Sequence, residues 1–228
     1  MNEPLPSGAA PKTRGRVIHW ARLYDWGNRW LTFGRDRAIR ELVLELAQLK
    51  PGDQVLDVGC GPGSLAVAAK AKVGSAGAVS GIDASPEMIA AACRKAARLG
   101  VDVAFRVGLI EAIPFPNAQF DVVLSTFMLH HLPEDLKRKG IAEIHRVLKP
   151  GGRFLGVDFQ PSAYSVTRVL TRSLFGHHMM ESDLGKLEPL MRETGFATVE
   201  VGTTRYRTVG FARGTRGEGT LASGNSRL

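Results

Sequence analysis

Cysteine is scarce in this chain, which holds only Cys60 and Cys93 in 228 residues. The two thiols lack the paired spacing of a metal site or a redox motif, and so few of them are typical of a protein of the reducing cytoplasm. Long apolar runs are missing as well, since none approaches the roughly 18 residues that a membrane-spanning helix needs. Residues 1–16 lack the apolar core of a signal peptide. We therefore expect a cytoplasmic protein without a transmembrane segment, and we interpret residues 1–16 as a flexible leader.

Acidic residues are few near both ends of the chain. The net charge is +8, but residues 1–40 hold eight Lys and Arg against three acids, and residues 205–228 hold five against one, so the body is close to neutral. Such ends could contact anionic lipid or RNA, although solvated tails explain them more simply. We do not expect nucleic acid as a partner, and a peripheral membrane contact stays open. A hydrophobic content of 44% and a charged content of 23% fit one soluble globular domain.

The chain is organised around the run VLDVGCGPG at residues 55–63. Its apolar, β-branched beginning predicts a buried parallel strand. Gly59, Gly61 and Gly63 then let the backbone approach a ligand with no Cβ in between. Pro62 is placed to begin the following helix, whose N-terminal N–H groups would face the bound molecule. An ordinary turn between strand and helix would have no use for three glycines in five residues.

The spacing of these glycines narrows the choice of ligand. They follow G-x-G-x-G instead of the G-x-G-x-x-G of a dinucleotide site, and the sequence holds no P-loop. Asp83, 20 residues after Gly63, ends a second predicted strand, where a carboxylate can accept hydrogen bonds from ribose hydroxyls. The pattern predicts a nucleoside cofactor better than a pyrophosphate.

Four segments occur in the order VLDVGCGPG (55–63), GIDASPEMI (81–89), IPFPNAQFDVVLSTFMLHHL (113–132) and VLKPGGRF (147–154). Together they resemble a class I S-adenosylmethionine-dependent methyltransferase, and within that superfamily they are most similar to the ubiquinone/menaquinone C-methyltransferase branch. The resemblance covers roughly residues 20–212. It implies an α/β fold, a Rossmann-like three-layer sandwich whose seven-stranded, mostly parallel sheet ends in a C-terminal antiparallel hairpin. It also implies S-adenosyl-L-methionine as the cofactor and S-adenosyl-L-homocysteine as the product.

Periodicity and turn signals place the elements along the chain. Helices are predicted at 36–49, from the glycine turn to 73, and at 85–99, 134–148 and 183–194; strands are predicted at 53–58, 78–82, 101–107, 121–125, 153–158, 197–203 and 205–212. We expect a single domain over 17–213 and a flexible tail over 214–228. The resemblance implies that 17–50 form an N-terminal helical lid and that the insertion 159–182 roofs the substrate pocket.

The resemblance and the strand ends together give a set of cofactor-binding residues. It comprises Tyr24, Asp57, Gly59, Cys60, Gly61, Gly63, Asp83, Ala84, Met88, Leu109, Ile110, Glu111, Ser125 and Thr126. Tyr24 would contact the methionine portion or would simply pack in the lid. The family usually has an acid at position 109, which accepts from the adenine amino group, and this chain has Leu109. Adenine recognition then falls to backbone groups, to stacking on residues such as Ile82, Leu109 and Ile110, or to Glu111.

Methyl transfer from a sulfonium requires little covalent chemistry from the protein. The site must align nucleophile, methyl carbon and sulfur, exclude water, and accept a proton when the nucleophile carries one. His130 and His131 follow the fourth predicted strand and are the candidate catalytic residues, although a packing role would also explain one of them. The expected substrate contacts are Trp26, Trp30, Phe127, His130, His177 and His178. No third ligand with suitable spacing accompanies the histidine pairs, so we expect no metal.

The acceptor is the least determined part of this interpretation. We expect a methyltransferase for a small or lipid-like molecule, such as an aromatic or quinone-type compound, working as a monomer or homodimer. An N-methyltransferase for an amine or a lipid headgroup and an RNA methyltransferase are the alternatives. The stretch Ser125-Thr126-Phe127-Met128 has no Pro-Pro motif, which counts against nucleobase amines. A cofactor-binding regulator without catalysis is a further alternative, because Leu109 departs from the family pattern.

Overall fold

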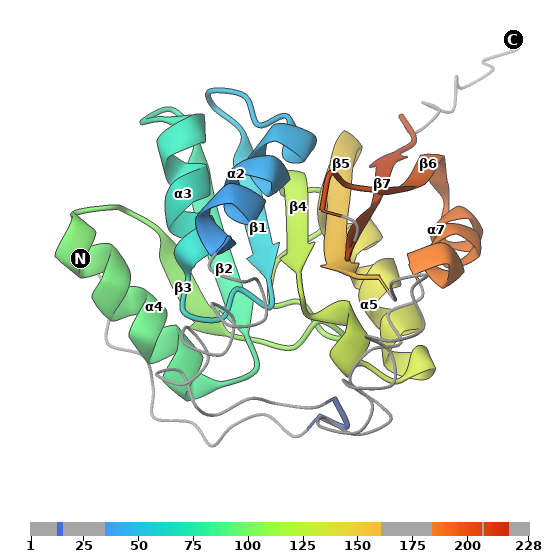
Figure 1. Cartoon of the computed structure of the whole chain (residues 1–228), viewed down its shortest axis with the longest axis horizontal. Helices are drawn as coiled ribbons and strands as arrows, with labels where there is room; N and C mark the ends of the chain where they lie inside the picture. Colours follow the sequence, from blue (N-terminus) through green and yellow to red (C-terminus); the bar gives the residue numbers. More distant parts are fainter. Residues whose placement is uncertain (1–12, 16–34, 161–183, 207, 219–228) are drawn as a thin grey trace, which may run out of the picture.

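Seven strands form one sheet in the order β3-β2-β1-β4-β5-β7-β6. The computed structural model describes residues 13–15, 35–160, 184–206 and 208–218 (Figure 1). The strands are β1 (Gln54–Val58), β2 (Ala78–Asp83), β3 (Ala104–Val107), β4 (Phe120–Thr126), β5 (Leu148–Phe159), β6 (Phe196–Thr203) and β7 (Val209–Arg216).

The sheet is parallel from β3 to β5, and it ends in the antiparallel strands β7 and β6. The predicted α/β architecture with a C-terminal antiparallel hairpin is therefore confirmed. The strand β1 lies between β2 and β4, so the chain runs outward in opposite directions from this point. In open α/β sheets a ligand crevice forms beyond the carboxyl ends of the strands at such a reversal.

Helices cover both faces of the sheet (Figure 1). The helices α2 (Asp36–Ala47), α3 (Ser64–Val73) and α4 (Pro86–Leu99) contribute to the buried cluster on one face, and α5 (Glu134–Val147) and α7 (Leu187–Thr194) to the cluster on the other. Two short 3₁₀ turns, η1 (Leu129–His131) and η2 (Leu184–Lys186), precede α5 and α7. The arrangement is a helix–sheet–helix sandwich, as the resemblance implied.

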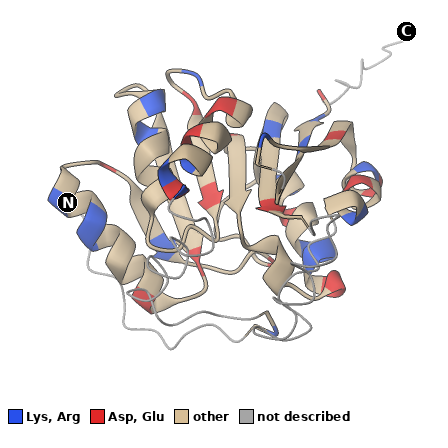
Figure 2. Ribbon diagram, viewed as in Figure 1, with Lys and Arg blue, Asp and Glu red and all other residues tan. Residues whose placement is uncertain are grey.

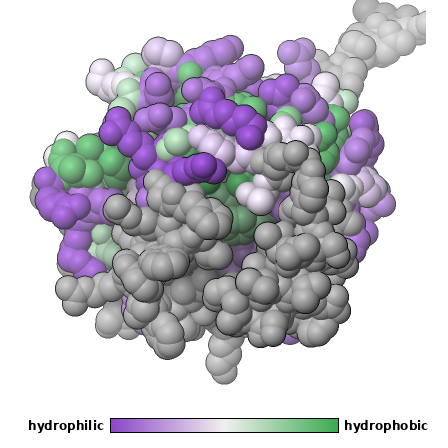
Figure 3. Space-filling model, in the orientation of Figure 1, coloured by the Kyte–Doolittle hydropathy of each residue, from purple (hydrophilic) through white to green (hydrophobic). Residues whose placement is uncertain are grey.

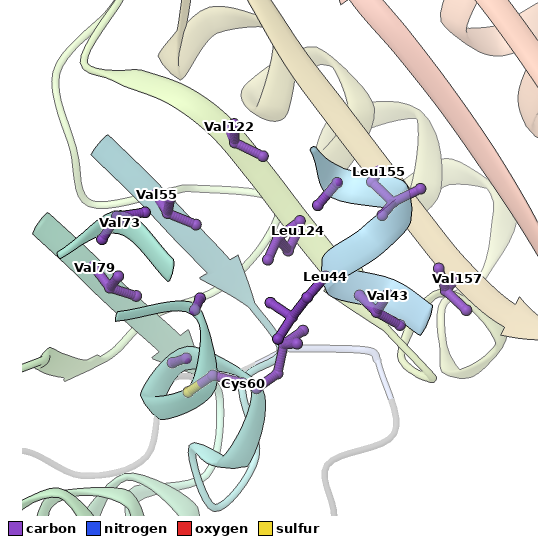
Figure 4. Packing of buried hydrophobic residues seen from close by; sticks show 14 of the residues in the cluster. Val43, Leu44, Val55, Cys60, Val73, Val79, Val122, Leu124, Leu155 and Val157 are labelled. Atoms are coloured by element: carbon purple, nitrogen blue, oxygen red, sulfur yellow. The ribbon is translucent and has the colours of Figure 1, made fainter. Parts of the chain in front are cut away.

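The first of the two clusters joins α2 to the middle of the sheet. Figure 4 shows Val43 and Leu44 of α2 lying against side chains of β1, β4 and β5. Val55 and Leu124 are completely buried there, and Leu155 is 2% exposed. Burying such side chains stabilises the fold by roughly 1.5–3 kcal/mol each. This packing holds β1 and β4 rigid up to the point where their carboxyl ends meet the crevice.

Some predicted boundaries are wrong, each for a local reason. Pro62 does not begin the helix after the glycine turn: Gly63 caps the helix in the left-handed region (φ 78°), so α3 begins at Ser64. The expected last strand, 205–212, is shifted to Val209–Arg216. The Thr204 hydroxyl accepts from the N–H of Tyr206 and contacts the carbonyl of Val209, which holds a turn where a strand was expected. Residues 214–216 therefore pair in β7, in contrast to the tail expected from 214.

The charged side chains of the described helices are mixed in sign, as Figure 2 shows for this view. The described part of the face in Figure 3 is mostly hydrophilic, with scattered hydrophobic patches. Leu99, at the end of α4, is 54% exposed. None of the described helices has the length and apolarity needed to cross a bilayer.

Candidate functional site

A pocket lies at the carboxyl ends of β1, β2 and β4, where the sheet topology predicts a ligand site. Its wall combines the glycine turn, the end of β2, the loop after β3, the residues after β4 and a short N-terminal segment. The lining residues are Thr13, Gly15, Val58, Gly59, Gly61, Asp83, Ala84, Met88, Gly108, Leu109, Ile110, Glu111, Phe127, Met128, His131 and Leu132.

The glycine turn is held in place by the strand beside it. The N–H groups of Gly59 and Cys60 donate to the carbonyl of Ile82 over 2.8 and 2.9 Å. Gly59 has a φ of 73°, and a Cβ at this position would lie 2.5 Å from Cγ of Met128. Glycine is therefore required here for close approach as well as for backbone conformation. Gly61 also lines the pocket, whereas Gly63 packs against Phe105 and does not.

Asp83 forms the acidic edge of the pocket. Its Oδ2 accepts from the N–H of Gly61 over 2.9 Å, and its Oδ1 accepts from the N–H of Ser85 over 2.9 Å. Burial raises the pKa of this carboxyl, and the two backbone hydrogen bonds oppose that shift. Each carboxylate oxygen can accept a second hydrogen bond, so Asp83 can still receive a ligand hydroxyl. Ala84 and Met88, both predicted cofactor residues, line the pocket beside it.

Asp57 lies behind the glycine turn and is 1% exposed. Neither of its carboxylate oxygens has a hydrogen-bond partner among the described residues. Burial, and secondarily the charge of Asp83, raise the pKa of Asp57 to about 7, while the nearby backbone of Ala66 lowers it. Asp57 does not line the pocket, so the structure does not support a direct contact between Asp57 and a cofactor in that pocket. A buried acid without a donor is costly unless a cation or a donor arrives.

The loop after β3 carries the residues predicted to recognise adenine. Leu109, Ile110 and Glu111 all line the pocket. The side chain of Ile110 is directed at Gly140 of α5, where an added Cβ would lie 2.7 Å from Cδ1 of Ile110. Ile82 is fully buried and does not line the pocket, so stacking on Ile82 and on the Ile110 side chain is not supported by the geometry.

The segment 13–15 closes one side of the pocket, although the sequence assigns it to a flexible leader. The Thr13 hydroxyl donates to Oε1 of Glu111 over 2.6 Å. Arg14 forms an ion pair with Asp135 at the start of α5. Thr13 and Gly15 both line the pocket. Glu111 is thus already in contact with the chain's own N-terminal segment.

The end of β4 places an aromatic residue in an unusual conformation at the pocket. Phe127 has a φ of 52°, which is rare for a bulky side chain, and its N–H donates to the carbonyl of Val157 over 2.9 Å. Its ring stacks on Phe159 with centroids 4.4 Å apart. Strained backbone of this kind persists where the surrounding structure enforces it, commonly at functional sites. Of the neighbouring predicted residues, Ser125 is fully buried and neither it nor Thr126 lines the pocket.

The two adjacent histidines after β4 differ in position. His131 lines the pocket, whereas the His130 side chain is 6% exposed and does not. Nδ1 of His130 lies 2.7 Å from Oδ1 of Asp158, at the end of β5. The two imidazole centroids are 3.9 Å apart. The predicted histidine pair is therefore divided into one residue on the pocket wall and one paired with a buried acid.

Several predicted residues stand apart from the pocket. Cys60 is buried beneath the glycine turn and is not part of the lining. Tyr24, Trp26, Trp30, His177 and His178 lie outside the described residues. Sequence reasoning missed Asp158 and the lining residues Thr13, Gly15, Val58, Gly108, Met128 and Leu132. Gly108 and Asp158 could have been predicted from the sequence, because both lie at the ends of predicted parallel strands, where open α/β sheets bind ligands.

This arrangement suits a cation that carries hydroxyl groups. A buried acid, Asp57, and a half-buried acid, Asp83, lie close to the glycine turn, of which Gly59 and Gly61 line the pocket. A positively charged ligand would relieve the cost of the Asp57 carboxylate, and Asp83 can accept from its hydroxyls. Leu109, Phe127, Met128 and Leu132 supply an apolar wall for a second, uncharged molecule.

Comparison with known proteins agrees with this geometry. A family model described as "Methyltransferase domain" matches residues 55–152. A demethylmenaquinone methyltransferase of Thermus thermophilus is 38% identical over 138 residues, which are 60% of this chain and 61% of that protein. The match thus spans less than two thirds of that relative. A demethylmenaquinone methyltransferase of Deinococcus radiodurans is 31% identical over 210 residues, which are 82% of this chain and 83% of that protein.

The fold is also found among solved structures. A SAM-dependent methyltransferase from Aquifex aeolicus superposes with a TM-score of 0.64 at 25% identity, over 77% of this chain and 88% of that chain. The superposition covers a larger share of the chain than the segment matched by the family model.

Proposed function

This chain belongs to the class I S-adenosylmethionine-dependent methyltransferases, and we propose that it transfers the methyl group of S-adenosylmethionine to a small, lipid-like acceptor of the quinone type. The observation that carries the proposal is the pairing of the glycine turn with Asp83, whose carboxylate faces the pocket and is bound to the N–H of Gly61. The likeness to two demethylmenaquinone methyltransferases supports the acceptor class.

The residues present fit S-adenosylmethionine. The carboxylate of Asp57 behind the pocket wall matches a positively charged ligand, and Gly59 and Gly61, which line the pocket without side chains, match a ligand that approaches the backbone closely. Asp83 would hold the ribose hydroxyls, and Leu109 with the backbone of the loop after β3 would border the adenine. When bound, the cofactor supplies an electrophilic methyl group on a sulfonium. Tyr24 remains a proposed contact to its methionine portion.

The acceptor would lie against the apolar side of the pocket. Phe127, Met128 and Leu132 provide the wall for a flat apolar ring, and Trp26, Trp30, His177 and His178 remain proposed contacts. In a reduced quinone, a ring carbon beside a hydroxyl is the nucleophile. A carbon–carbon bond forms as the sulfur–carbon bond breaks, and the ring loses one proton. His131 on the pocket wall, with His130 behind it, is placed to take up that proton.

We infer that the protein works in the cytoplasm as a monomer or homodimer. Cys60 and Cys93 are both free thiols, which fits a reducing compartment. An acceptor with a lipid tail would bring the protein to a membrane surface without a spanning helix, and the basic ends of the chain suit such a contact.

Transfer of a radiolabelled methyl group tests this proposal. The purified full-length chain would be supplied with labelled S-adenosylmethionine and, in separate reactions, with a naphthoquinol that is unsubstituted at one ring carbon, phosphoethanolamine or transfer RNA. We expect label on the naphthoquinol only, and we expect Asp83→Asn to lower it at a limiting cofactor concentration while Asp102→Asn, an exposed control, retains it. Label on the amine or RNA, or no label in any reaction, would contradict the proposed acceptor.

A further inference from the structure

Asp158 has a buried carboxylate near the pocket that belongs neither to the glycine turn nor to the pocket wall. Asp158 is the penultimate residue of β5 and is 0% exposed. A buried acid must be paired or fully hydrogen-bonded, because an isolated one costs several kcal/mol. The partners of Asp158 therefore indicate what it is for.

Within the part of the chain that the structure describes, the hydrogen-bond partners of Asp158 are His130, after the end of β4, and the backbone of the next residue, Phe159. Oδ1 is 2.7 Å from Nδ1 of His130 and accepts from the N–H of Phe159 over 2.8 Å. Oδ2 accepts from the backbone N–H of His130 over 3.0 Å. Asp158 thus contacts both the ring and the main chain of His130, which fixes the 3₁₀ turn η1 at the end of β4.

The chemistry of these contacts determines the tautomer of His130. An ionised carboxylate only accepts hydrogen bonds, so the proton of a neutral imidazole must be on Nδ1 and the lone pair on Nε2. The same turn carries His131, whose ring centroid is 3.9 Å from that of His130 and which lines the pocket. The ring of Phe159 makes a T-shaped contact with His130, at 5.8 Å between centroids.

We propose that Asp158 is a positioning residue, which keeps Nε2 of His130 as the basic nitrogen and holds the turn that presents His131 to the acceptor. Its catalytic part rests on the proposed function, in which this pair of histidines accepts the proton lost by the ring. That proton moves from the acceptor to the lone pair of a ring nitrogen of His131, the histidine on the pocket wall, so no oxidant or further reactant is needed. Asp158 does not line the pocket, so it acts through His130.

Asp158→Asn distinguishes this role from simple packing. Asparagine has the same shape, but its amide NH₂ can only donate where the second carboxylate oxygen accepted. The amide can be turned either way. If its NH₂ replaces Oδ2, it faces the backbone N–H of His130, and Nδ1 keeps its proton but loses a charged acceptor. If its NH₂ replaces Oδ1, it faces the N–H of Phe159, and Nδ1 must accept, so the proton moves to Nε2. In a Ser-His-Asp triad the corresponding exchange lowers kcat about 10⁴-fold through the wrong tautomer.

The first readout is the tautomer of His130, from nitrogen chemical shifts in protein labelled at its six histidines. His130→Gln assigns the signal. We expect Nδ1–H in the wild-type protein, and in Asp158→Asn either Nε2–H or an Nδ1–H signal shifted by the loss of the charged acceptor. An Nε2–H tautomer in the wild-type protein, or no change in the variant, would overturn the proposal, and this readout requires no turnover.

The second readout compares the effect of Asp158→Asn on kcat with its effect on the dissociation constant of S-adenosylmethionine. We expect Asp158→Asn to lower kcat for the naphthoquinol by about 10²-fold, within the range for general bases, and to change the dissociation constant of S-adenosylmethionine less than twofold. In a His130→Gln background the same substitution should have no further effect on kcat. Full kcat in the variant would overturn the catalytic part. A wild-type protein that methylates no quinol would instead contradict the proposed function. The nitrogen chemical shifts of His130 would still test whether Asp158 sets its tautomer.

Discussion

The side chain of Met128 occupies the space directly in front of Gly59. A Cβ built on this glycine would lie 2.5 Å from Cγ and 2.9 Å from Cβ of Met128, which is closer than carbon atoms approach in proteins. The two residues come from the ends of β1 and β4 and both line the pocket. The glycine turn is therefore fitted to the neighbouring strand end as well as to a ligand.

Gly59→Ala should be destabilising for two reasons. The positive φ strains any residue with a Cβ, and the contact with Met128 forces the pocket wall to move, so we expect a loss of about 2–4 kcal/mol. Gly52→Ala is the matched control, because Gly52 has a φ of 92° with nothing within 4 Å of an added Cβ, and we expect only about 1–2 kcal/mol there. Urea unfolding of the three proteins measures the difference. Equal losses of unfolding free energy in the two variants would show that the Met128 side chain moves aside without an energetic penalty.

Ionisation of Asp57 should make the ligand-free protein less stable at high pH. Its pKa is about 7 in the folded state, against an ordinary value of 3.8. A raised pKa means that the folded state holds the proton more tightly, so stability present at low pH is lost as the pH rises through 7. The full effect approaches about 4 kcal/mol, at roughly 1.4 kcal/mol per unit of pKa.

Comparing the wild-type protein with Asp57→Asn isolates this contribution. We expect the free energy of unfolding of the wild-type protein to fall between pH 5 and pH 8 relative to that of the variant, with no cofactor present. Parallel pH dependences in the two proteins would show that Asp57 is ionised throughout this range.

Asp83→Asn should weaken cofactor binding. The change removes a negative charge that faces the pocket and turns one accepting oxygen into a donor beside the N–H of Gly61 or Ser85. Loss of a charge-assisted hydrogen bond costs about 1.5–3 kcal/mol, which corresponds to a rise of roughly 10- to 150-fold in the dissociation constant of S-adenosylmethionine. Calorimetry measures it, with Asp102→Asn as control. A change below threefold would remove Asp83 from the cofactor site.

Phe127→Leu should affect the acceptor and not the cofactor. Leucine keeps the pocket apolar but loses the ring that stacks on Phe159, an interaction of about 0.5–1.5 kcal/mol. We expect a rise in KM for the naphthoquinol and no change in the affinity for S-adenosylmethionine, measured in the same assay series. The opposite pattern would place Phe127 in the cofactor site.

The order of elements could be predicted because the signals are local. Ser85 caps α4 as predicted, its hydroxyl accepting from the N–H of Met88, and Gly195 ends α7. The strands of the parallel sheet are short apolar runs with turns on both sides, and glycine spacing alone indicated the ligand turn. Such features depend on neighbours within a few residues, which the sequence displays directly.

The remaining features depend on contacts between distant segments. Thr13 and Glu111 are 98 residues apart, and His130 and Asp158 are 28 residues apart, so neither pair is visible as a motif. The left-handed conformation of Phe127 opposes the local preference of a bulky residue, and tertiary packing enforces it. The burial of Asp57 behind the glycine turn likewise follows from how α3 packs, which the spacing did not reveal.

Proton release on cofactor binding tests the central claim most directly. S-adenosylmethionine bound in the pocket would bring its positive charge close to Asp57 behind the pocket wall, which favours the carboxylate of an acid whose pKa burial raises to about 7. Titration calorimetry in two buffers of different ionisation enthalpy should therefore show net proton release from the wild-type protein, and none from Asp57→Asn. Binding without proton release, or no binding at all, would contradict the account.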